Sequence, residues 1–254
     1  MTNISASQVK ELREKTGLGL MDCKKALEDT NGDLDSAVEE LRKTSGLKAS
    51  KKSSRSAADG LIGIESLEGR AFMVEINCET DFVARDDSFN SFMQEVLEIV
   101  SSNKDKSLEE LLEEGIEEKR EKLVQKLGEN IVVRRISASE DSADSSGVYL
   151  HSNNKIGAII SLKGGTEEVA KDIAMHAAAT DPMAISPSDI AQDVIDKERE
   201  IYKAQSEESG KPADIVEKMI EGKIRKFLSE VSLTEQDFVK DPSIKINDLL
   251  KNNN

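Results

Sequence analysis

The sequence predicts an α+β protein with helix in the majority, on the basis of its composition and its apolar patterns. Of the 254 residues, 37% are apolar, 33% are charged and only 3% are aromatic, with no Trp. Such a composition favours helices around thin cores over a sandwich or barrel packed with aromatic rings. Short apolar runs bounded by turn residues indicate strands in the middle of the chain. The length suggests one large or two to three small domains.

The overall charge restricts the kind of partner. A formal net charge of −15 opposes sequence-independent binding to phosphate backbones, because that binding depends on Lys and Arg. We therefore expect a protein partner and no direct contact with nucleic acid. Cys23 and Cys78 lie far apart, and the sequence has neither a run of about 18 apolar residues nor a charged-then-apolar leader. We expect a soluble, cytoplasmic protein without membrane contact.

Residues 1–45 are expected to form a self-contained bundle of three short helices. Ser5 followed by Gln8 matches a capping box, and Gly17 suits the residue after a helix end. Asp33 can cap the third helix, whose apolar residues recur with helical spacing. A unit of this size is near the lower limit for independent folding, so it suits docking better than an active site.

Three apolar residues next to the predicted loop between the first two helices are candidates for a docking patch. They are Leu18, Leu20 and Met21. The alternative is that they belong to the ordinary core of the bundle.

Residues 46–56 are expected to be a linker. They are rich in Ser and Lys and offer little that could pack. A short solvated tether in an acidic protein explains their basic residues better than RNA binding does.

Two layers are expected to follow, each consisting of a strand hairpin with helices. Core subdomain N comprises residues 57–139, and core subdomain C comprises residues 140–187 and 229–254, the second part apparently short. The elements expected in the first layer are strands 61–67 and 71–78, a helix through 89–100, a helix over 107–127 and strand 131–136. Those of the second are strands 148–151 and 156–162 and a helix opened by Thr166. Residues 188–228 are predicted to be an inserted antiparallel helical hairpin, with helices 189–208 and 213–228 around a turn at 209–212.

The segment Glu75–Arg85 runs from an apolar strand into a polar corner that carries Phe82. Burying a Phe side chain is worth roughly 1.5 to 3 kcal/mol. An aromatic ring left exposed at such a corner would therefore be suited to covering by a partner. The alternative is that Phe82 packs under the helix that follows.

The residues capable of chemistry do not form a recognisable active site. Asp81, Asp86 and Asp87 lack the spacing of a calcium loop, so helix caps and solvated charge explain them better. His176 lies in a run of Ala and is read as a packing histidine, whereas His151 ends a strand and is either a partner contact or a plain turn residue. Phosphate-binding loops, Cys-x-x-Cys pairs and nucleophile elbows are absent from the sequence. We expect neither an enzyme nor a resident cofactor or metal.

Two long segments and several short ones resemble the elongation factor Ts family. The long segments are Leu12–Leu27, containing Thr-Gly-Leu-Gly-Leu-Met-Asp-Cys, and Glu75–Arg85. The short ones follow in order at 126–130, 149–151, 174–176, 221–223 and 238–242. The resemblance thus extends over nearly the whole chain.

The resemblance implies a guanine-nucleotide exchange factor for elongation factor Tu. Residues 1–45 would be a ubiquitin-associated-like domain docked on the nucleotide-binding domain of Tu, and the helical hairpin would mediate dimerisation or further Tu contacts. The residues implied to disturb the magnesium and phosphate site of Tu are Thr80, Asp81, Phe82 and Val83. The residues implied to bind Tu are Arg13, Leu20, Met21, Leu127, Gly128, His151 and Val239.

The chain departs from the family pattern in two places. The family continues past Leu249–Leu250 into another strand, so the second sheet is expected to lack a strand and to leave an unpaired edge. Asp237 stands where the family commonly has Pro. The shortened C-terminus supports an alternative function, a protein that binds Tu without exchanging its nucleotide.

Overall fold

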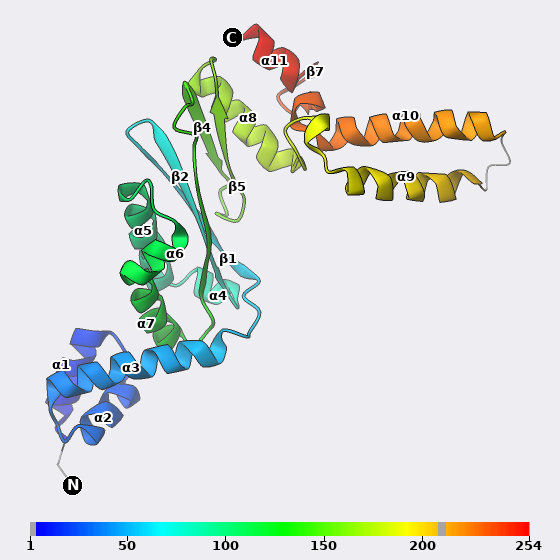
Figure 1. Ribbon diagram of the computed structural model, residues 1–254. Helices are drawn as coiled ribbons and strands as arrows, with labels where there is room; N and C mark the ends of the chain where they lie inside the picture. The colour runs from blue at the N-terminus through cyan, green and yellow to red at the C-terminus, as the bar shows by residue number, and fades with distance from the viewer. Residues whose placement is uncertain (1–3, 208–211, 254) are drawn as a thin grey trace. The chain divides into compact units, whose positions relative to one another are not determined.

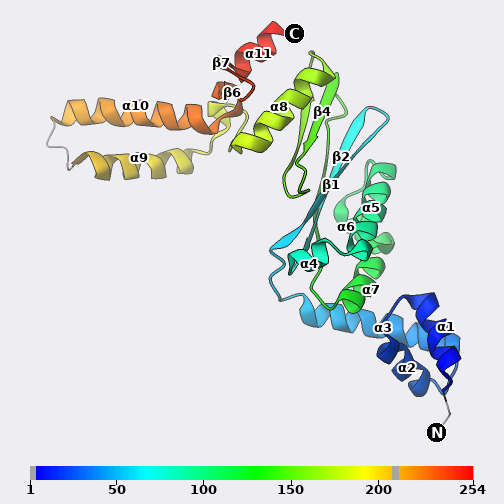
Figure 2. The same cartoon turned by 180° about the vertical axis from the view of Figure 1, so that it is seen from behind.

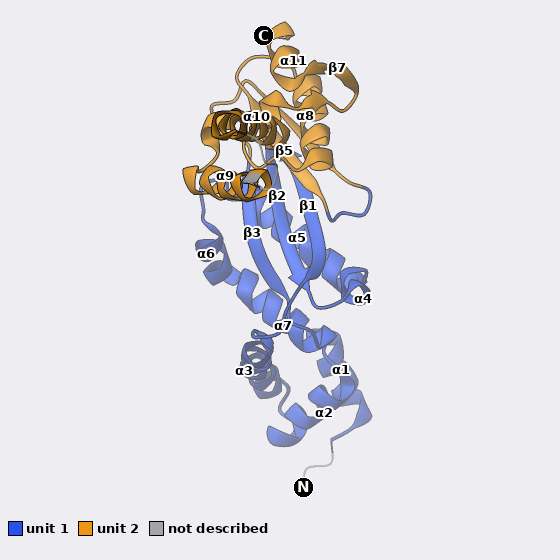
Figure 3. Ribbon diagram, turned by 90° about the vertical axis from the view of Figure 1, so that its right-hand side faces the viewer, with its two compact units in different colours: residues 1–138, 152–155 blue, residues 139–151, 156–254 orange. Residues whose placement is uncertain are grey.

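The computed structural model describes residues 4–207 and 212–253 (Figure 1). The chain divides into two compact units (Figure 3). Unit 1 comprises residues 1–138 and 152–155, and unit 2 comprises residues 139–151 and 156–254. Helices surround small antiparallel sheets in both units, which confirms the α+β class.

The N-terminal bundle of unit 1 consists of α1 (Ala6–Thr16), α2 (Leu20–Asp29) and α3 (Leu34–Lys52). The predicted capping box is present: the Ser5 hydroxyl accepts from the Gln8 amide, and the Gln8 side chain accepts from the Ser5 amide. Gly17 ends α1 with a φ of 68°, a conformation that glycine adopts without strain. The bundle core contains Val9, Leu12, Leu18, Cys23, Ala26, Leu27, Ala37 and Leu41.

The expectation that 46–56 is a solvated linker is wrong for its first half. Helix α3 continues through Lys52 and packs along α7 (Glu117–Leu127). Ser45 and Ala49, one turn apart, are both buried, and the Ser45 hydroxyl donates to the side chain of Gln125. Small side chains at this spacing allow two helices to approach closely, and this tertiary contact overrides the polar composition.

The sheet of unit 1 has the order β1-β2-β3, with all neighbours antiparallel. Its strands are β1 (Asp59–Leu67), β2 (Arg70–Cys78) and β3 (Val132–Ala138). Helices α5 (Asp87–Ser102) and α7 lie along one side of this sheet (Figure 2). Gly63 on β1 allows α5 to lie close, because a Cβ there would stand 2.8 Å from the sulfur of Met93. The core of unit 1 fills the space between this sheet and these helices.

Two short helices complete unit 1. α4 (Asp81–Ala84) is a single turn directly after β2, and α6 (Leu108–Leu111) begins with the capping box predicted at Ser107. The helix expected over 107–127 is interrupted by a π-helical turn, Leu112–Ile116, because Gly115 has a φ of 127°. Helix α7 then ends at Gly128, whose φ is 83°.

Unit 2 pairs the hairpin of β4 (Ser145–Leu150) and β5 (Gly157–Leu162) with α8 (Glu167–Thr180), which Thr166 caps. The remaining elements are α9 (Gln192–Glu207), α10 (Ala213–Val231), β6 (Asp237–Phe238), β7 (Asp241–Lys245) and α11 (Ile246–Asn252). Helices α9 and α10 pack on each other as an antiparallel pair. Residue 208, the predicted end of the first helix, and residues 209–211 of the predicted turn lie outside the described residues.

Leu249 and Leu250, near the C-terminus, lie in helix α11. Helix α11 buries Ile246 against Ile173, Leu233 and Phe238. Asp237, which replaces the Pro usual in the family, is the first residue of β6 and pairs with Lys245 of β7. The local turn therefore forms without the proline.

Candidate partner-binding site

The corner after β2 is a compact structure made by Thr80 and the single turn of α4. Thr80 is in an extended conformation and its hydroxyl accepts from the amide of Val83, which starts the turn. Asp81 forms an ion pair of 2.9 Å with Arg85. Val83 and Ala84 are buried and anchor the turn in the core of unit 1. Asp86 then caps α5 by accepting from the Ser88 amide at 2.7 Å.

Phe82 points away from this anchored turn, with 80% of its surface exposed. The alternative in which the ring packs under the following helix is therefore wrong for the chain by itself. The reason is local: in a one-turn helix, the adjacent residues Val83 and Ala84 occupy the inward side, which leaves Phe82 on the outward side.

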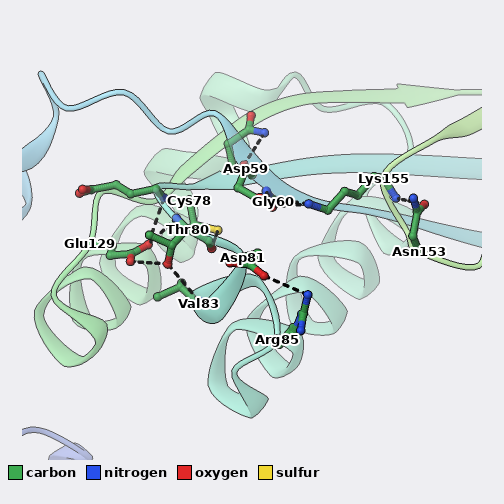
Figure 4. Close-up of polar contacts among 12 residues, drawn as sticks. Asp59, Gly60, Cys78, Thr80, Asp81, Val83, Arg85, Glu129, Asn153 and Lys155 are labelled. Carbon is green, nitrogen blue, oxygen red and sulfur yellow. Dashed lines mark hydrogen bonds and ion pairs between the residues drawn. The ribbon is translucent and has the colours of Figure 1, made fainter.

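The carboxylate of Glu129, from a segment distant in the sequence, binds the corner where the chain enters α4 (Figure 4). Glu129, just after α7, accepts from the amides of Glu79 and Thr80 at 3.1 and 3.0 Å, and from the Thr80 hydroxyl at 2.6 Å. In return, Glu79 accepts from the amide of Asn130 at 2.6 Å. We call these four residues, Glu79, Thr80, Glu129 and Asn130, the carboxylate clasp.

The clasp also joins the end of α3. Arg55 lies 3.5 Å from the Glu79 carboxylate, and its carbonyl accepts from the side-chain amide of Asn130 at 2.8 Å. Sequence reasoning missed Glu79, Glu129 and Asn130 as site residues. The only signals came from the family resemblance: Glu79 lies in the long segment Glu75–Arg85, where only residues 80–83 received a role, and Glu129 and Asn130 lie in the short segment 126–130, where only Leu127 and Gly128 did.

Two ionisable groups near the corner have shifted pKa values. Burial raises the pKa of the Cys78 thiol to about 11, with the nearby Glu129 carboxylate as the next cause. The thiol donates to the carbonyl of Thr80 at 3.2 Å. The backbone hydrogen bond from Ser88 lowers the pKa of Asp86. Cys78 is thus a neutral structural thiol at pH 7, and Asp86 is an ionised cap.

Two of the three residues in the candidate docking patch of the bundle are exposed. Leu20 and Met21 have exposed fractions of 54% and 71%, and Arg13 is exposed at the last turn of α1. Leu18 is buried in the bundle core, so the core alternative holds for this residue. An ion pair of 2.8 Å between Asp22 and Lys48 ties α2 to α3 next to the exposed pair.

Leu127 and Gly128 lie next to the corner, because the clasp residue Glu129 follows them directly. Leu127 is half-buried against the core of unit 1, and Gly128 is exposed at the end of α7. Both residues thus stand just before the clasp in sequence, and their role in binding stays a prediction.

In unit 2, the two predicted contacts are exposed. His151 follows β4, and its ring centroid lies 6.4 Å from that of Tyr149. Val239 is exposed, and its amide donates to Nδ1 of His176 at 3.2 Å. His176 itself is fully buried, with Nε2 2.9 Å from the side-chain oxygen of Gln236, as expected of a packing histidine.

The described residues contain no group of three or more side chains suited to hold a metal ion. The carboxylates considered for that role have other partners, since Asp81 pairs with Arg85 and Asp86 caps α5. Within the same part of the chain, no helix has the length and apolar character needed to cross a membrane.

Comparison with known proteins agrees with the resemblance. The sequence model of the family described as elongation factor TS matches residues 79–254. The elongation factor Ts of Hahella chejuensis is 54% identical over 253 residues, which cover 99% of this chain and 88% of the relative. Those of Francisella tularensis subsp. novicida and Marinobacter nauticus are each 52% identical, over 257 and 253 residues that cover 99% of this chain and 88% and 87% of the relatives. The chain belongs to the elongation factor Ts family of translation elongation factors.

Proposed function

We propose that this chain is a guanine-nucleotide exchange factor for elongation factor Tu, without covalent chemistry of its own. It binds the GDP form of Tu and promotes GDP release in the cytoplasm during translation elongation. Family membership supports the partner. The observation that carries the mechanism is the exposed Phe82 on an anchored turn, because a rigid, solvent-exposed aromatic side chain is suited to insertion into a partner.

In this mechanism the corner Thr80–Val83 approaches the magnesium and phosphate site of Tu. Magnesium and backbone amides neutralise the charge of the GDP phosphates, so disturbing the metal weakens nucleotide binding as well. Phe82 acts as a wedge that stabilises the disturbed state. Because coupling between two binding sites is reciprocal, GDP weakens the binding of this chain to Tu by the same factor. The factor therefore dissociates when nucleotide rebinds and can act again.

Other exposed residues supply the docking energy. Arg13, Leu20 and Met21 bind Tu through the N-terminal bundle, and Leu127 and Gly128 support the contact around the corner. In unit 2, His151 and Val239 are the proposed contacts. The antiparallel pair α9 and α10 is proposed to form a homodimer or a 2:2 complex, and it presents the exposed side chains of Ile201 and Ile215.

The test is the release of a fluorescent GDP analogue from purified elongation factor Tu. The wild-type chain should accelerate release, and Phe82→Ala should reduce the acceleration by about tenfold or more, which corresponds to a loss of about 1.4 kcal/mol or more in the barrier. Ile185→Ala, which truncates another exposed apolar side chain, is the matched control and should behave as wild type. Binding of Tu without any acceleration would refute the exchange function and favour the alternative, a Tu-binding protein that does not exchange nucleotide.

A further inference from the structure

We propose that Glu129 is a positioning residue for nucleotide exchange, because its carboxylate sets the orientation in which the Thr80–Val83 corner presents Phe82. This inference rests on the proposed function. Glu129 does not need to touch Tu for this role, since it acts through the backbone that carries the wedge.

The local geometry shows why the corner needs an external anchor. Helix α4 has only four residues, and an isolated helical turn is unstable because few hydrogen bonds offset the cost of fixing its backbone. Phe82 is 80% exposed, so it contributes little packing that could fix the turn. The buried side chains of Val83 and Ala84 hold the inward side only.

Glu129 supplies that anchor at the start of the turn. One carboxylate oxygen accepts from two consecutive amides, those of Glu79 and Thr80, and the other accepts from the Thr80 hydroxyl. Hydrogen bonds to an ionised acceptor are stronger than those between neutral groups. Three such bonds to two adjacent residues fix both the position and the direction of the chain where it enters α4.

The anchor is itself held in place. Gly128 takes a φ of 83°, which ends α7, and the next residue, Glu129, faces Glu79 and Thr80 just after β2. The next residue, Asn130, is buried and donates its amide to Glu79 and its side chain to the carbonyl of Arg55. Glu129 therefore extends from a segment with fixed partners on both sides, as a positioning group requires.

The proposal predicts a loss in maximal exchange rate with little loss in docking. Glu129→Ala removes all three bonds but leaves the exposed residues Arg13, Leu20 and Met21 intact. In the GDP-release assay with increasing concentrations of this chain, the maximal rate should fall about tenfold, as expected when an interaction of hydrogen-bond strength is lost. The concentration that gives half the maximal rate should change by less than about threefold, since the docking energy is intact.

The conservative variant separates geometry from general destabilisation. In Glu129→Gln, the amide oxygen can accept from the same backbone amides and the amide nitrogen can donate to the Thr80 hydroxyl, so most of the rate should return. Glu110→Ala is the matched control, because Glu110 likewise accepts from a backbone amide and a hydroxyl, both of Ser107, in the capping box of α6. It should exchange nucleotide at the wild-type rate.

A second measurement needs no Tu and tests the clasp directly. Hydrogen–deuterium exchange at the amides of Glu79 and Thr80 should be faster in Glu129→Ala than in the wild type or in Glu110→Ala, because their acceptor is gone. Circular dichroism confirms that each variant is folded. Unchanged amide exchange in Glu129→Ala would overturn the proposal.

The outcomes separate this proposal from the proposed function. If the wild type does not accelerate GDP release, the proposed function is wrong, whatever the amide exchange shows. If the wild type accelerates release and Glu129→Ala reaches a maximal rate within about twofold of it, exchange is established and the positioning role is wrong. A Glu129→Gln variant as slow as Glu129→Ala would also overturn the role, because the loss would not follow hydrogen-bond geometry.

Discussion

Phe82 in α4 and Phe89 in α5 have the same kind of side chain in opposite environments. Truncating each to Ala should therefore affect stability and nucleotide exchange in opposite ways. Phe82 is 80% exposed, whereas Phe89 is 0% exposed in the core. Phe82→Ala should leave the free energy of unfolding nearly unchanged and reduce the acceleration of GDP release by about tenfold or more. Phe89→Ala should strongly destabilise the fold.

The magnitudes follow from burial. Full burial of a Phe side chain contributes about 1.5–3 kcal/mol, so the one-fifth of Phe82 that is covered contributes about 0.3–0.6 kcal/mol. The higher helix propensity of Ala offsets up to about 0.5 kcal/mol of this in α4. Truncating a fully buried Phe costs about 3–5 kcal/mol, because a cavity remains as well. The two variants should therefore differ by about 3 kcal/mol or more.

Urea unfolding followed by far-ultraviolet circular dichroism measures both effects. The chain has two units, so the transition that Phe89→Ala shifts to lower urea identifies the unfolding of unit 1. In that same transition, Phe82→Ala should have the wild-type midpoint. A loss of more than about 1.5 kcal/mol in Phe82→Ala would refute the reasoning, because the ring would then contribute to the fold as a buried Phe does.

Three further experiments test the packing of Gly147, the packing of Ala49 and the pKa of Cys78. Gly147→Ala should destabilise unit 2 by about 1–3 kcal/mol or more, since a Cβ there would lie 2.0 Å from the amide nitrogen of Lys171. Gly222→Ala is the control, because a Cβ at that position of α10 meets open space and should not destabilise the unit. Urea unfolding followed by tyrosine fluorescence measures both variants, and equal unfolding midpoints would contradict the expectation. Ala49→Glu should destabilise unit 1 by about 2 kcal/mol or more, because position 49 is buried against α7. Ser50→Glu, at the exposed neighbouring position, should not destabilise it. Equal urea midpoints for the two variants would mean that residues 46–52 form a solvated linker. The Cys78 pKa of about 11 lies above its ordinary value of 9.0, so between these pH values the folded state retains a proton that the unfolded state loses. The free energy of unfolding that this proton contributes is fully present below pH 9 and is lost as the pH rises through 11. Cys78→Ala should lack this decline of about 2–3 kcal/mol in unfolding titrations, and parallel pH profiles would refute the shift.

Local signals predicted the elements of the fold well. The caps at Ser5, Asp33, Ser107 and Thr166 start helices where expected, because a side-chain oxygen that satisfies a free amide acts within three residues. The strands lie within a few residues of their expected ranges, because alternation and turn residues are also local. Gly17 ends a helix for the same kind of reason.

Two of the missed features, the length of α3 and the clasp, depend on contacts between distant segments. The extension of α3 through Lys52 needs α7, which lies about 70 residues further along the chain, and polar composition hides it. The clasp needs Glu129 to meet Thr80 across 49 residues, and neither residue stands out in the sequence. The two readings of Phe82 stayed open because the packing of Val83 and Ala84 in the core decides which side of α4 faces outward.

The exposure of the Phe82 ring and the hydrogen bonds of the carboxylate clasp fit the same proposed role. A Phe left in water forgoes stabilisation in the free chain, and that energy becomes available only when a partner covers the ring. Under the proposed function, this energy favours the opened nucleotide site of Tu most when the ring enters in one orientation, because ordering a mobile corner on binding would consume part of the gain. The capping hydroxyl of Thr80, the buried Val83 and the carboxylate of Glu129 remove that mobility before binding. The residues around Phe82 thus stabilise the corner, while the ring itself remains exposed.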